Sequence, residues 1–332
     1  MADAFLPKKK PLTKDDIKRL RESLPKKVEI SSEGTKITKK DEEVEEVAPI
    51  LESHSNEISV PLSAEEIRAF QIYATMLKEK NKVMNLTAVD DDKGIAMKHF
   101  IDSLTLCPYI REEEAKAKKD KLTFVDVGTG AGFPGLPVKI SCPELSVTLM
   151  DSLDKRLKFL DEVITALDLK DCVTVHSRAE DAGRNKKFRE KYDIVTARAV
   201  ARLSVLAEYC LPLVKVGGVF LAMKAHSEEE EKEAGKAIAL LGGTIEKTDS
   251  FTLPGSDMER SIIVVRKIRP TTQGSNSGLL HCRKILYCLS YQGSPYIYVH
   301  TYIYIYISEA QRSNSDINLT VTIKWMVSKA MR

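Results

Sequence analysis

The feature that most restricts how this chain can fold is a glycine-rich turn that follows a short apolar stretch. The segment reads Phe124-Val125-Asp126-Val127-Gly128-Thr129-Gly130-Ala131-Gly132-Phe133-Pro134-Gly135. The apolar residues predict a buried strand, and the residues beyond the last glycine predict a helix. The whole chain holds only 16 glycines, so this local density is not that of an ordinary turn. Because glycine has no Cβ atom, a ligand can lie directly against the backbone of such a turn.

Strand and helix patterns alternate along the chain on both sides of this turn. Strands are expected at Leu122–Val127, Ser146–Met150, Cys172–His176, Tyr192–Ala197, Val219–Lys224, Thr244–Leu253 and Arg260–Lys267. Helical patterns separate the first six, whereas only the turn Pro254-Gly255-Ser256 separates the last two. The predicted fold class is therefore α/β: a Rossmann-like, doubly wound sheet, mostly parallel, with one antiparallel strand at its end. Class I methyltransferases have this layout.

A helical segment is expected before the sheet. Ser63-Ala64-Glu65-Glu66 has the capping-box pattern, in which a hydroxyl at the N-cap is followed three residues later by a carboxylate. Apolar residues at helical spacing follow it, and a second helix is expected at Ile95–Leu106. Ordered structure is thus predicted for residues 61–269, as one domain with N-terminal helices.

The two ends of the chain differ from this middle part. Residues 1–60 are rich in Lys and Glu with little apolar periodicity, which predicts a disordered extension. Residues 270–332 form an atypical tail that is expected to be unstructured. Residues 296–307 are nearly a Tyr-Ile repeat, which is either an exposed edge strand or translated repeat DNA at a mispredicted exon end. We favour the second interpretation, which implies a eukaryotic gene with introns.

Composition sets the broad class of the protein. With 43% hydrophobic and 30% charged residues it resembles soluble globular proteins, and its net charge of +3 is too small to indicate nucleic acid by itself. None of the six cysteines has CxxC spacing, so reduced cysteines in a reducing compartment are expected and a zinc site is not. No apolar run is long enough for a membrane span. The expected location is the cytoplasm, or the plastid stroma if the gene comes from a plant.

Two kinds of nucleotide-containing cofactor fit the glycine-rich turn. Gly130-x-Gly132-x-x-Gly135 has the spelling of a dinucleotide-binding fingerprint, but Pro134 and Pro137 occupy the start of the helix that such a fingerprint needs. The longer pattern Asp126-x-Gly128-x-Gly130-x-Gly132 fits the loop of an S-adenosyl-L-methionine-dependent methyltransferase better. Gly128 and Gly130 are then expected beside the amino-acid and sulfonium end of the cofactor.

Two further segments are expected near the same ligand. Asp151 ends the second strand, where an acid can accept both hydroxyls of a ribose, although a solvated turn acid is the alternative. Ser177-Arg178-Ala179-Glu180-Asp181 follows the third strand. It could bracket the edge of an adenine, or it could simply start a helix.

Several motifs in order carry a resemblance to a known family. They are the glycine-rich loop at Val125–Pro137, together with Asn85–Thr87, Lys98–Leu104, Asp151–Arg156, Ser177–Asp181 and Thr196–Ala201. From about Ser63 to Lys267 the chain resembles the glucose-inhibited division protein B family, the guanine-N7 methyltransferases of small-subunit ribosomal RNA. Members usually end in a basic tail containing Pro and Gly, whereas an unrelated tail follows Pro270 here. If that basic tail grips RNA, this chain should be weakened or inactive.

The resemblance implies the cofactor, the partner and part of the site. It implies S-adenosyl-L-methionine bound by Gly128, Phe133, Ala179 and Glu180, with Arg198 nearby, and small-subunit ribosomal RNA or a 30S-type subunit as the partner. Guanine N7 carries a free lone pair at neutral pH and can attack the sulfonium methyl group directly. The enzyme then mainly aligns the reacting atoms, so neither a catalytic base nor a metal is expected.

Several polar residues are candidates for contacts to RNA. Arg198 ends the fourth strand and could contact the cofactor carboxylate, an RNA phosphate or a structural acid. Lys98 and His99 could reach RNA phosphate, although His99 could equally be a satisfied, partly buried histidine. Asn85 could cap or orient its loop, and Lys224 ends the fifth strand at the same edge of the sheet.

Two other classes of function stay open from the sequence. One is a methyltransferase of the same fold that acts on a small molecule or a protein. The other is a non-catalytic RNA-binding factor for ribosome assembly that retains a vestigial cofactor site. In each case the protein is expected to be a monomer.

Overall fold

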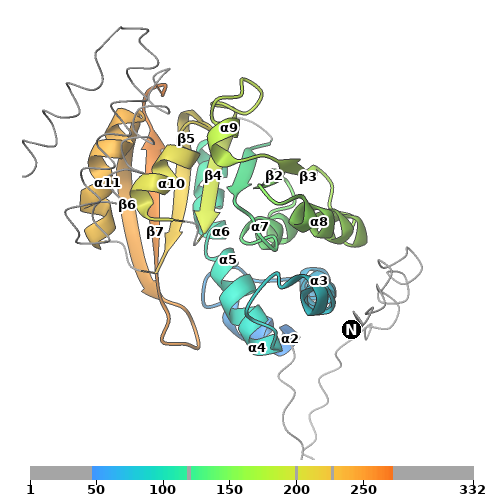
Figure 1. The fold of residues 1–332 in the computed structure, drawn as a ribbon. Helices are drawn as coiled ribbons and strands as arrows, with labels where there is room; N and C mark the ends of the chain where they lie inside the picture. Colours follow the sequence, from blue (N-terminus) through green and yellow to red (C-terminus); the bar gives the residue numbers. More distant parts are fainter. Residues whose placement is uncertain (1–46, 118–120, 199–200, 226–227, 272–332) are drawn as a thin grey trace, which may run out of the picture. The chain divides into compact units, whose positions relative to one another are not determined.

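The fold is built around one twisted sheet (Figure 1). The computed structural model describes residues 47–117, 121–198, 201–225 and 228–271. Within them, seven strands form a single sheet in the order β3-β2-β1-β4-β5-β7-β6. The strands are β1 (Thr123–Val127), β2 (Ser146–Asp151), β3 (Cys172–His176), β4 (Tyr192–Arg198), β5 (Val214–Lys224), β6 (Gly243–Thr252) and β7 (Glu259–Lys267). The predicted fold class is confirmed.

The single antiparallel strand does not lie where the sequence pattern predicted it. Strands β1 to β5 pair in parallel, but β7 is inserted between β5 and β6 and runs antiparallel to both, so β6 forms the edge. The burial of the two strands explains this order. Ile262–Val265 of β7 form an uninterrupted buried run, as in an interior strand. Along β6 only Gly243 is buried, and the other residues are half-buried or exposed, which suits an edge.

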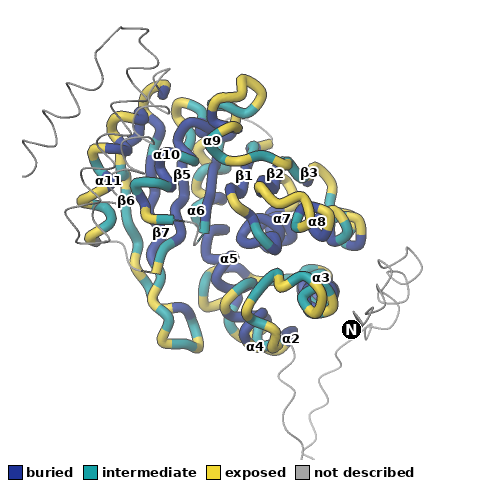
Figure 2. The backbone as a smooth tube through the Cα atoms, in the orientation of Figure 1, coloured by how far each residue is buried: buried dark blue, intermediate teal, exposed yellow. Residues whose placement is uncertain are grey.

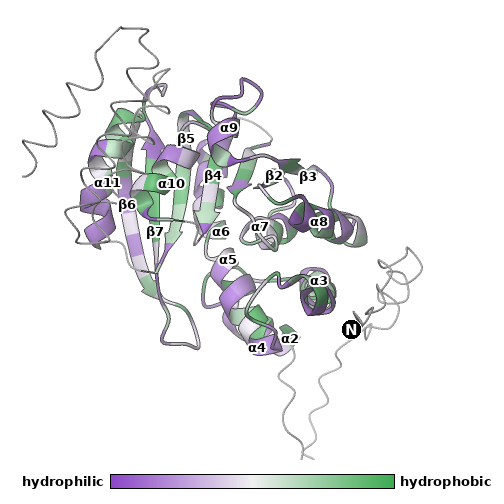
Figure 3. Cartoon of the chain, viewed as in Figure 1, coloured by the Kyte–Doolittle hydropathy of each residue, from purple (hydrophilic) through white to green (hydrophobic). Residues whose placement is uncertain are grey.

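Helices cover both faces of the sheet, as a doubly wound fold requires. One hydrophobic core joins the face that carries Phe124 to α7 (Gly135–Ser141), α8 (Asp154–Ala166) and the N-terminal helices. The other core joins the face that carries Val125 mainly to α10 (Leu203–Cys210) and α11 (Glu228–Leu240). Figure 2 shows the buried strands between these exposed helical surfaces, and Figure 3 shows the matching apolar residues in the strands. A further short helix, α9 (Ala179–Ala182), follows β3.

The helical segment before the sheet contains one unusual turn. Helix α3 (Ala64–Met84) begins with the predicted capping box and ends at Asn85, whose φ of 49° is left-handed. The second expected helix is divided into α4 (Asp92–Gly94), the π-helix η1 (Ile95–Ile101) and α5 (Asp102–Leu104), and α6 (Cys107–Lys116) follows. Single π-helical turns are rare and occur frequently at functional sites.

Folded structure begins earlier than the predicted boundary at residue 61. Helix α2 spans Val47–His54 and buries Val47, Ala48 and Leu51 against the helical segment. The predicted disordered extension, residues 1–60, is therefore wrong for residues 47–60. The apolar stripe of α2 is only two turns long and follows an acidic cluster, so its periodicity is weak in the sequence. Residues 1–46 lie outside the described residues.

The described fold also extends slightly past the predicted boundary at residue 269. Thr271 is 4% exposed, its backbone N–H donates to Glu190 Oε1 at 2.7 Å and its hydroxyl donates to Leu241 O at 2.8 Å. The predicted tail therefore begins two residues too early, because Thr271 completes the packing around β7. The rest of the tail, including the Tyr-Ile run, lies outside the described residues and its character stays a prediction.

The described residues show how the cysteines are placed and what the helices can span. Cys107, Cys142, Cys172 and Cys210 are buried free thiols. Cys282 and Cys288 lie outside the described part of the chain. Among the described residues, no helix is both long enough and apolar enough to cross a membrane.

Replacing Leu51 by Ala tests whether α2 belongs to the cooperative fold. Leu51 is fully buried, and removing such a side chain leaves a cavity that costs about 2–5 kcal/mol. Chemical denaturation should show a loss of this size, whereas Glu52→Ala, at an exposed position of the same helix, should leave the free energy of unfolding nearly unchanged. Equal midpoints for the two variants would show that α2 is not part of the folding unit.

Lys267 gives the fold a pH dependence in the alkaline range. Its ammonium is fully buried, donates to Leu211 O at 2.6 Å, and burial lowers its pKa to about 8. Between that pH and the ordinary lysine pKa of about 10.4, the unfolded chain binds a proton that the folded chain does not. The free energy of unfolding should therefore rise with pH across this window. Denaturation curves at pH 7.5 and 10 should show this rise in the free energy of unfolding for the wild type and a smaller rise for Lys267→Met. If the free energy of unfolding changes with pH equally in both proteins, Lys267 is not the cause.

Candidate functional site

Three adjoining pockets are lined by residues at the carboxyl ends of β1, β2, β4 and β5 and by their neighbours. The first, which we name the glycine-loop pocket, has a volume of about 520 Å3 and is lined by Gly128, Asp151, Ala179, Glu180, Arg198 and their neighbours. The second, the π-helix pocket, has about 570 Å3 and is lined by Lys98, His99, Asp102, Arg198, Met223, Lys224, Ala225, Glu230 and Arg260. The third is described below. Arg198 belongs to both of the first two.

The backbone of the glycine-rich loop is open to the first pocket. Gly128 and Gly130 have φ of 75° and 60°, in the left-handed region that favours glycine. The N–H of Gly128 donates to Met150 O at 2.8 Å and ties the loop to β2. A Cβ atom built on Gly130 would meet only Gly128 O, at 4.0 Å. The space beside Gly130 is therefore open, but of the two glycines only Gly128 is among the residues that line the glycine-loop pocket.

The other two glycines of the loop have a different purpose. A Cβ atom on Gly132 would lie 2.4 Å from Tyr73 Oη, and one on Gly135 would lie 2.3 Å from Leu149 Cδ2. Tyr73 is fully buried in α3 and donates a 2.5 Å hydrogen bond to Ala131 O. These glycines permit close packing of the loop against α3 and β2, a difference that the spelling of the motif does not reveal.

The buried carboxylate of Asp126 joins the two ends of the loop. Its Oδ2 accepts hydrogen bonds from Thr129 Oγ1 at 2.7 Å and from the backbone N–H of Gly135 at 2.8 Å. Burial raises the pKa of Asp126 to about 6. Its Oδ1 has no hydrogen-bond partner among the described residues. Through these two hydrogen bonds, Asp126 stabilises the conformation of the glycine-rich loop.

Asp151 fixes the loop from the side of β2. Its Oδ2 accepts from the N–H of Gly130 at 2.9 Å, and its Oδ1 accepts from the N–H of Leu153 at 2.8 Å. The residue is 3% exposed and lines the glycine-loop pocket. Arg156 approaches the same carboxylate at 3.4 Å. Asp151 is therefore not the solvated turn acid that the sequence left open.

The opposite wall of this pocket comes from α9 and α10. Ala179 and Glu180 open α9 and line the pocket, as does Tyr209 of α10. Burial raises the pKa of Tyr209, with a hydrogen bond to Glu180 contributing. The short α9 is thus both a helix start and a pocket wall.

Phe133 lies beneath the boundary between the first two pockets. Its ring stacks on His99 at a centroid distance of 4.4 Å and on Tyr73 at 5.4 Å. The guanidinium of Arg198 lies 5.3 Å from the same ring. Phe133 is buried and is not among the residues lining the glycine-loop pocket. Its side chain therefore supports the residues that separate the pockets.

Arg198 is held by the helical segment. Its Nη1 donates to Asp102 Oδ2 and to Lys98 O, both at 2.9 Å. Asp102 also forms an ion pair with Arg260, whose Nε donates a hydrogen bond to Asp102 Oδ1 at 2.7 Å. The sequence left a structural acid open as the partner of Arg198, and Asp102 is that acid. Asp102 stands within the motif Lys98–Leu104, and Arg260 begins a predicted strand, but nothing in the sequence indicated that they meet.

His99 is not a cation at neutral pH. Burial and the neighbouring Arg198 lower its pKa to about 4, and its Nε2 forms a 2.8 Å hydrogen bond with Thr87 Oγ1. This geometry fits the alternative of a satisfied, partly buried histidine. It does not fit a charged contact to phosphate. Lys98 is exposed beside it on η1, so the two adjacent residues differ in what they offer.

The remaining two candidates differ in position. Lys224 lines the π-helix pocket, but its amine already donates to Ala201 O at 2.9 Å and pairs with Glu230 at 2.8 Å. Asn85 is exposed and caps α3 through its left-handed backbone, and it is not among the residues lining any of the three pockets. Of the four RNA candidates, the structure brings Lys98, His99 and Lys224 together.

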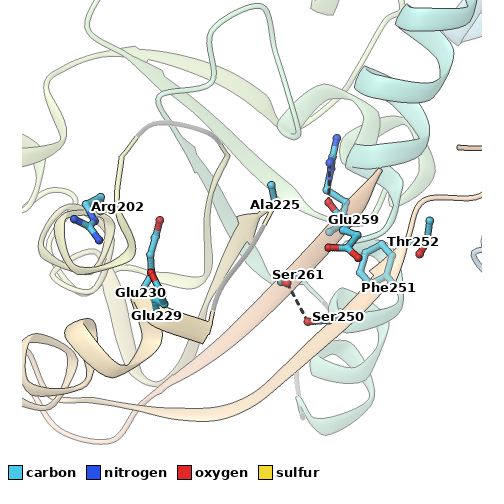
Figure 4. A pocket seen from close by; sticks show the side chains of 10 residues that line it. Arg202, Ala225, Glu229, Glu230, Ser250, Phe251, Thr252, Glu259 and Ser261 are labelled. Carbon is cyan, nitrogen blue, oxygen red and sulfur yellow. Dashed lines mark hydrogen bonds between the residues drawn. The ribbon is translucent and has the colours of Figure 1, made fainter. Parts of the chain in front are cut away.

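The third pocket, which we name the hairpin pocket, adjoins the second (Figure 4). It has about 620 Å3 and shares Ala225, Glu230 and Arg260 with the π-helix pocket. Ser250 and Ser261 of the β6–β7 hairpin form its floor and share a 3.0 Å hydrogen bond. Arg202 and Glu229 lie on its far side. The described residues hold no group of three or more acidic, His or Cys side chains that could bind a metal.

Comparison with known proteins identifies the family. Residues 66–261 match the GidB family model, described as rRNA small subunit methyltransferase G. The chain is 53% identical over 231 residues to Ribosomal RNA small subunit methyltransferase G of Acetivibrio thermocellus, which covers 70% of this chain and 93% of that protein. The Bacillus subtilis protein of the same name is 49% identical over 216 residues, 65% of this chain and 88% of the relative. The chain therefore belongs to the GidB family and is a methyltransferase with the class I fold described above.

Proposed function

We propose that the protein transfers the methyl group of S-adenosylmethionine to N7 of a guanine in small-subunit ribosomal RNA. The observation that supports this best is the shared wall between the glycine-loop pocket and the π-helix pocket. Arg198 lines both, so a cofactor in the first and a base in the second would meet beside it. The names of the relatives, rRNA small subunit methyltransferases, support RNA as the substrate.

The residues of the glycine-loop pocket fit the proposed cofactor. The open space beside Gly130 would receive the amino-acid and sulfonium end. The carboxylate of Asp151 could accept hydrogen bonds from ribose hydroxyls, and Ala179 with Glu180 would border the adenine. In a dinucleotide-binding fingerprint the second glycine lets the backbone approach the pyrophosphate, but here a Cβ atom on Gly132 would lie 2.4 Å from Tyr73 Oη, so Tyr73 fills that space. The packing therefore favours the smaller nucleoside cofactor.

The chemistry asks this chain mainly for alignment. When bound, the cofactor supplies an electrophilic methyl group, and guanine N7 supplies the attacking lone pair without prior deprotonation. The loop, held by Asp126 and Asp151, would orient the first reactant. Residues of the π-helix pocket would orient the second. Such alignment contributes much of a two-substrate rate enhancement, so a general base is not part of the proposal.

A small-molecule or protein substrate, and a vestigial site, are the competing functions. The deciding experiment is transfer of a labelled methyl group to isolated small-subunit RNA and to 30S-type subunits. Mass spectrometry of nuclease digests should then locate one 7-methylguanosine. Cofactor binding without transfer to either RNA would favour another substrate, and absence of cofactor binding would favour a non-catalytic RNA-binding factor.

We also propose the compartment in which the protein acts and its oligomeric state. Four buried free thiols support a reducing compartment, either the cytoplasm or, for a plant gene, the plastid stroma. We propose that the protein acts as a monomer, which light scattering on a size-exclusion column would test. A dimer mass would contradict it.

Replacing Gly130 by Val should abolish cofactor binding and leave the protein folded. The new side chain would enter the ligand space, and its left-handed backbone, with φ of 60°, would add strain of about 1–3 kcal/mol. Calorimetry should show no binding of S-adenosylmethionine while circular dichroism keeps the wild-type spectrum. Gly217→Val is the control, because Gly217 also has positive φ and open space around it but lies at the start of β5, away from the pockets. Wild-type affinity in Gly130→Val would refute the assignment of the loop.

Replacing Lys98 by Ala should weaken RNA binding and reduce its dependence on salt. Its exposed amine is available to a phosphate, and loss of one phosphate contact lowers the slope of log affinity against log salt by about one. Lys121→Ala is the control, because Lys121 pairs with Asp171 beside the opposite strand ends. Filter binding at several salt concentrations measures both variants. An unchanged slope for Lys98→Ala would remove Lys98 from the RNA surface.

A further inference from the structure

One buried carboxylate, of Asp102, binds the two arginines that lie between the three pockets. Asp102 is 4% exposed and stands directly after the π-helix η1, where its backbone N–H donates to the carbonyls of His99 and Met97. Its two oxygens point to different strands: Oδ2 accepts from Arg198 of β4 at 2.9 Å, and Oδ1 accepts from Arg260 of β7 at 2.7 Å. The position of each guanidinium is therefore set by the same side chain.

The two arginines occupy the walls between the pockets. Arg198 lines the glycine-loop pocket and the π-helix pocket, and Arg260 lines the π-helix pocket and the hairpin pocket. An RNA base placed in the π-helix pocket would therefore lie beside both arginines. Asp102 thus holds both guanidiniums that such an RNA base would approach.

The charges of this trio leave it suited to an anion. Two guanidiniums and one carboxylate have a net charge of +1. Asp102 uses one N–H of Arg260, and others contact Glu259 O at 2.9 Å and Met258 Sδ at 3.6 Å. A fixed guanidinium binds phosphate with less loss of side-chain entropy than a free one.

We propose that Asp102 is a positioning residue for RNA, and that Arg260, which it holds, contacts a phosphate of the strand next to the target guanine. This inference rests on the proposed function. It adds Arg260 as a residue that contacts RNA and Asp102 as the residue that orients Arg260. Arg260 lies at the junction of two pockets that have volumes of about 570 and 620 Å3. The hydroxyls of Ser250 and Ser261 in the hairpin pocket (Figure 4) provide polar contacts for the neighbouring nucleotide.

The chain contains a matched ion pair away from the pockets. Glu113 of α6 binds Arg266 of β7 at 2.7 Å, with side chains 13% and 19% exposed. The side chains of Asp102 and Arg260 are 5% and 21% exposed. Both pairs tie the same helical segment to the same strand, but neither Glu113 nor Arg266 lines any of the three pockets. Glu113→Gln therefore measures the purely structural effect of losing such a pair.

The experiment compares Asp102→Asn with Glu113→Gln in the full-length chain, at saturating S-adenosylmethionine. Simple electrostatics predicts that removing a negative charge beside an RNA surface tightens RNA binding. Positioning predicts the opposite sign, because the guanidiniums lose their fixed orientation. We expect the KM for small-subunit RNA to rise about tenfold in Asp102→Asn, the cost of one well-placed arginine contact. Glu113→Gln should lower the thermal midpoint and leave this KM unchanged.

Each result decides the matter. Tighter RNA binding in Asp102→Asn, or KM values equal to those of Glu113→Gln, would overturn the positioning role. If Asp102→Asn does not fold, Arg260→Lys replaces it: this variant keeps the charge and loses the Nε bond, so RNA affinity should fall while the salt slope stays the same. Unchanged affinity would overturn the role of Arg260. The wild-type protein is assayed first, and absence of RNA methylation there would refute the proposed function rather than this inference.

Discussion

The buried carboxylate of Asp126 is the interaction on which the site depends. Burying a carboxylate in an apolar interior is costly unless hydrogen bonds compensate. The Oδ2 atom of Asp126 receives two, from Thr129 and Gly135, whereas Oδ1 receives none among the described residues. Opening the loop would therefore remove both hydrogen bonds that the buried carboxylate has. The raised pKa of Asp126, about 6, is the sign of this burial. Gly130, which has open space beside it, is in turn held by Asp151.

The helical segment before the sheet is a structural part of the site. Tyr73 of α3 closes against Gly132 and donates to Ala131 O, while His99 stacks on Phe133. Asp102 then reaches across to β4 and β7. The Rossmann-like sheet supplies the strand ends, and the helices supply the second pocket. In the proposed function, the cofactor and the RNA base would therefore be bound by two layers that share the ring of Phe133 and the guanidinium of Arg198.

Much of the fold could be predicted because its signals are local. Alternating apolar runs located all seven strands, although Gly217-Gly218 hid the start of β5 at Val214. The place of β7 beside β5 could not be predicted from the hairpin turn, since pairing depends on which strand buries both faces. The residues of the site also fall into two groups, those that the sequence could predict and those that it could not. Gly128 and Asp151 follow from strand ends, whereas the union of Asp102 with Arg260, 158 residues apart in the chain, is produced only by tertiary packing. The neutral state of His99 likewise depends on neighbours that no spacing reveals.

The π-helix η1 has a consequence for how this family's chains can vary in length. A π-helical turn corresponds to an α-helix with one extra residue. Deleting one residue between Ile95 and Ile101 would restore a regular α-helix, which is the more favourable backbone. Because a π-turn takes up its extra residue within one turn, the helical residues on either side would keep nearly their present orientation. The change would be confined to the turn that carries Lys98 and His99, which line the π-helix pocket. A one-residue change of length at this turn would therefore reshape one pocket wall while the rest of the helical segment stays in place.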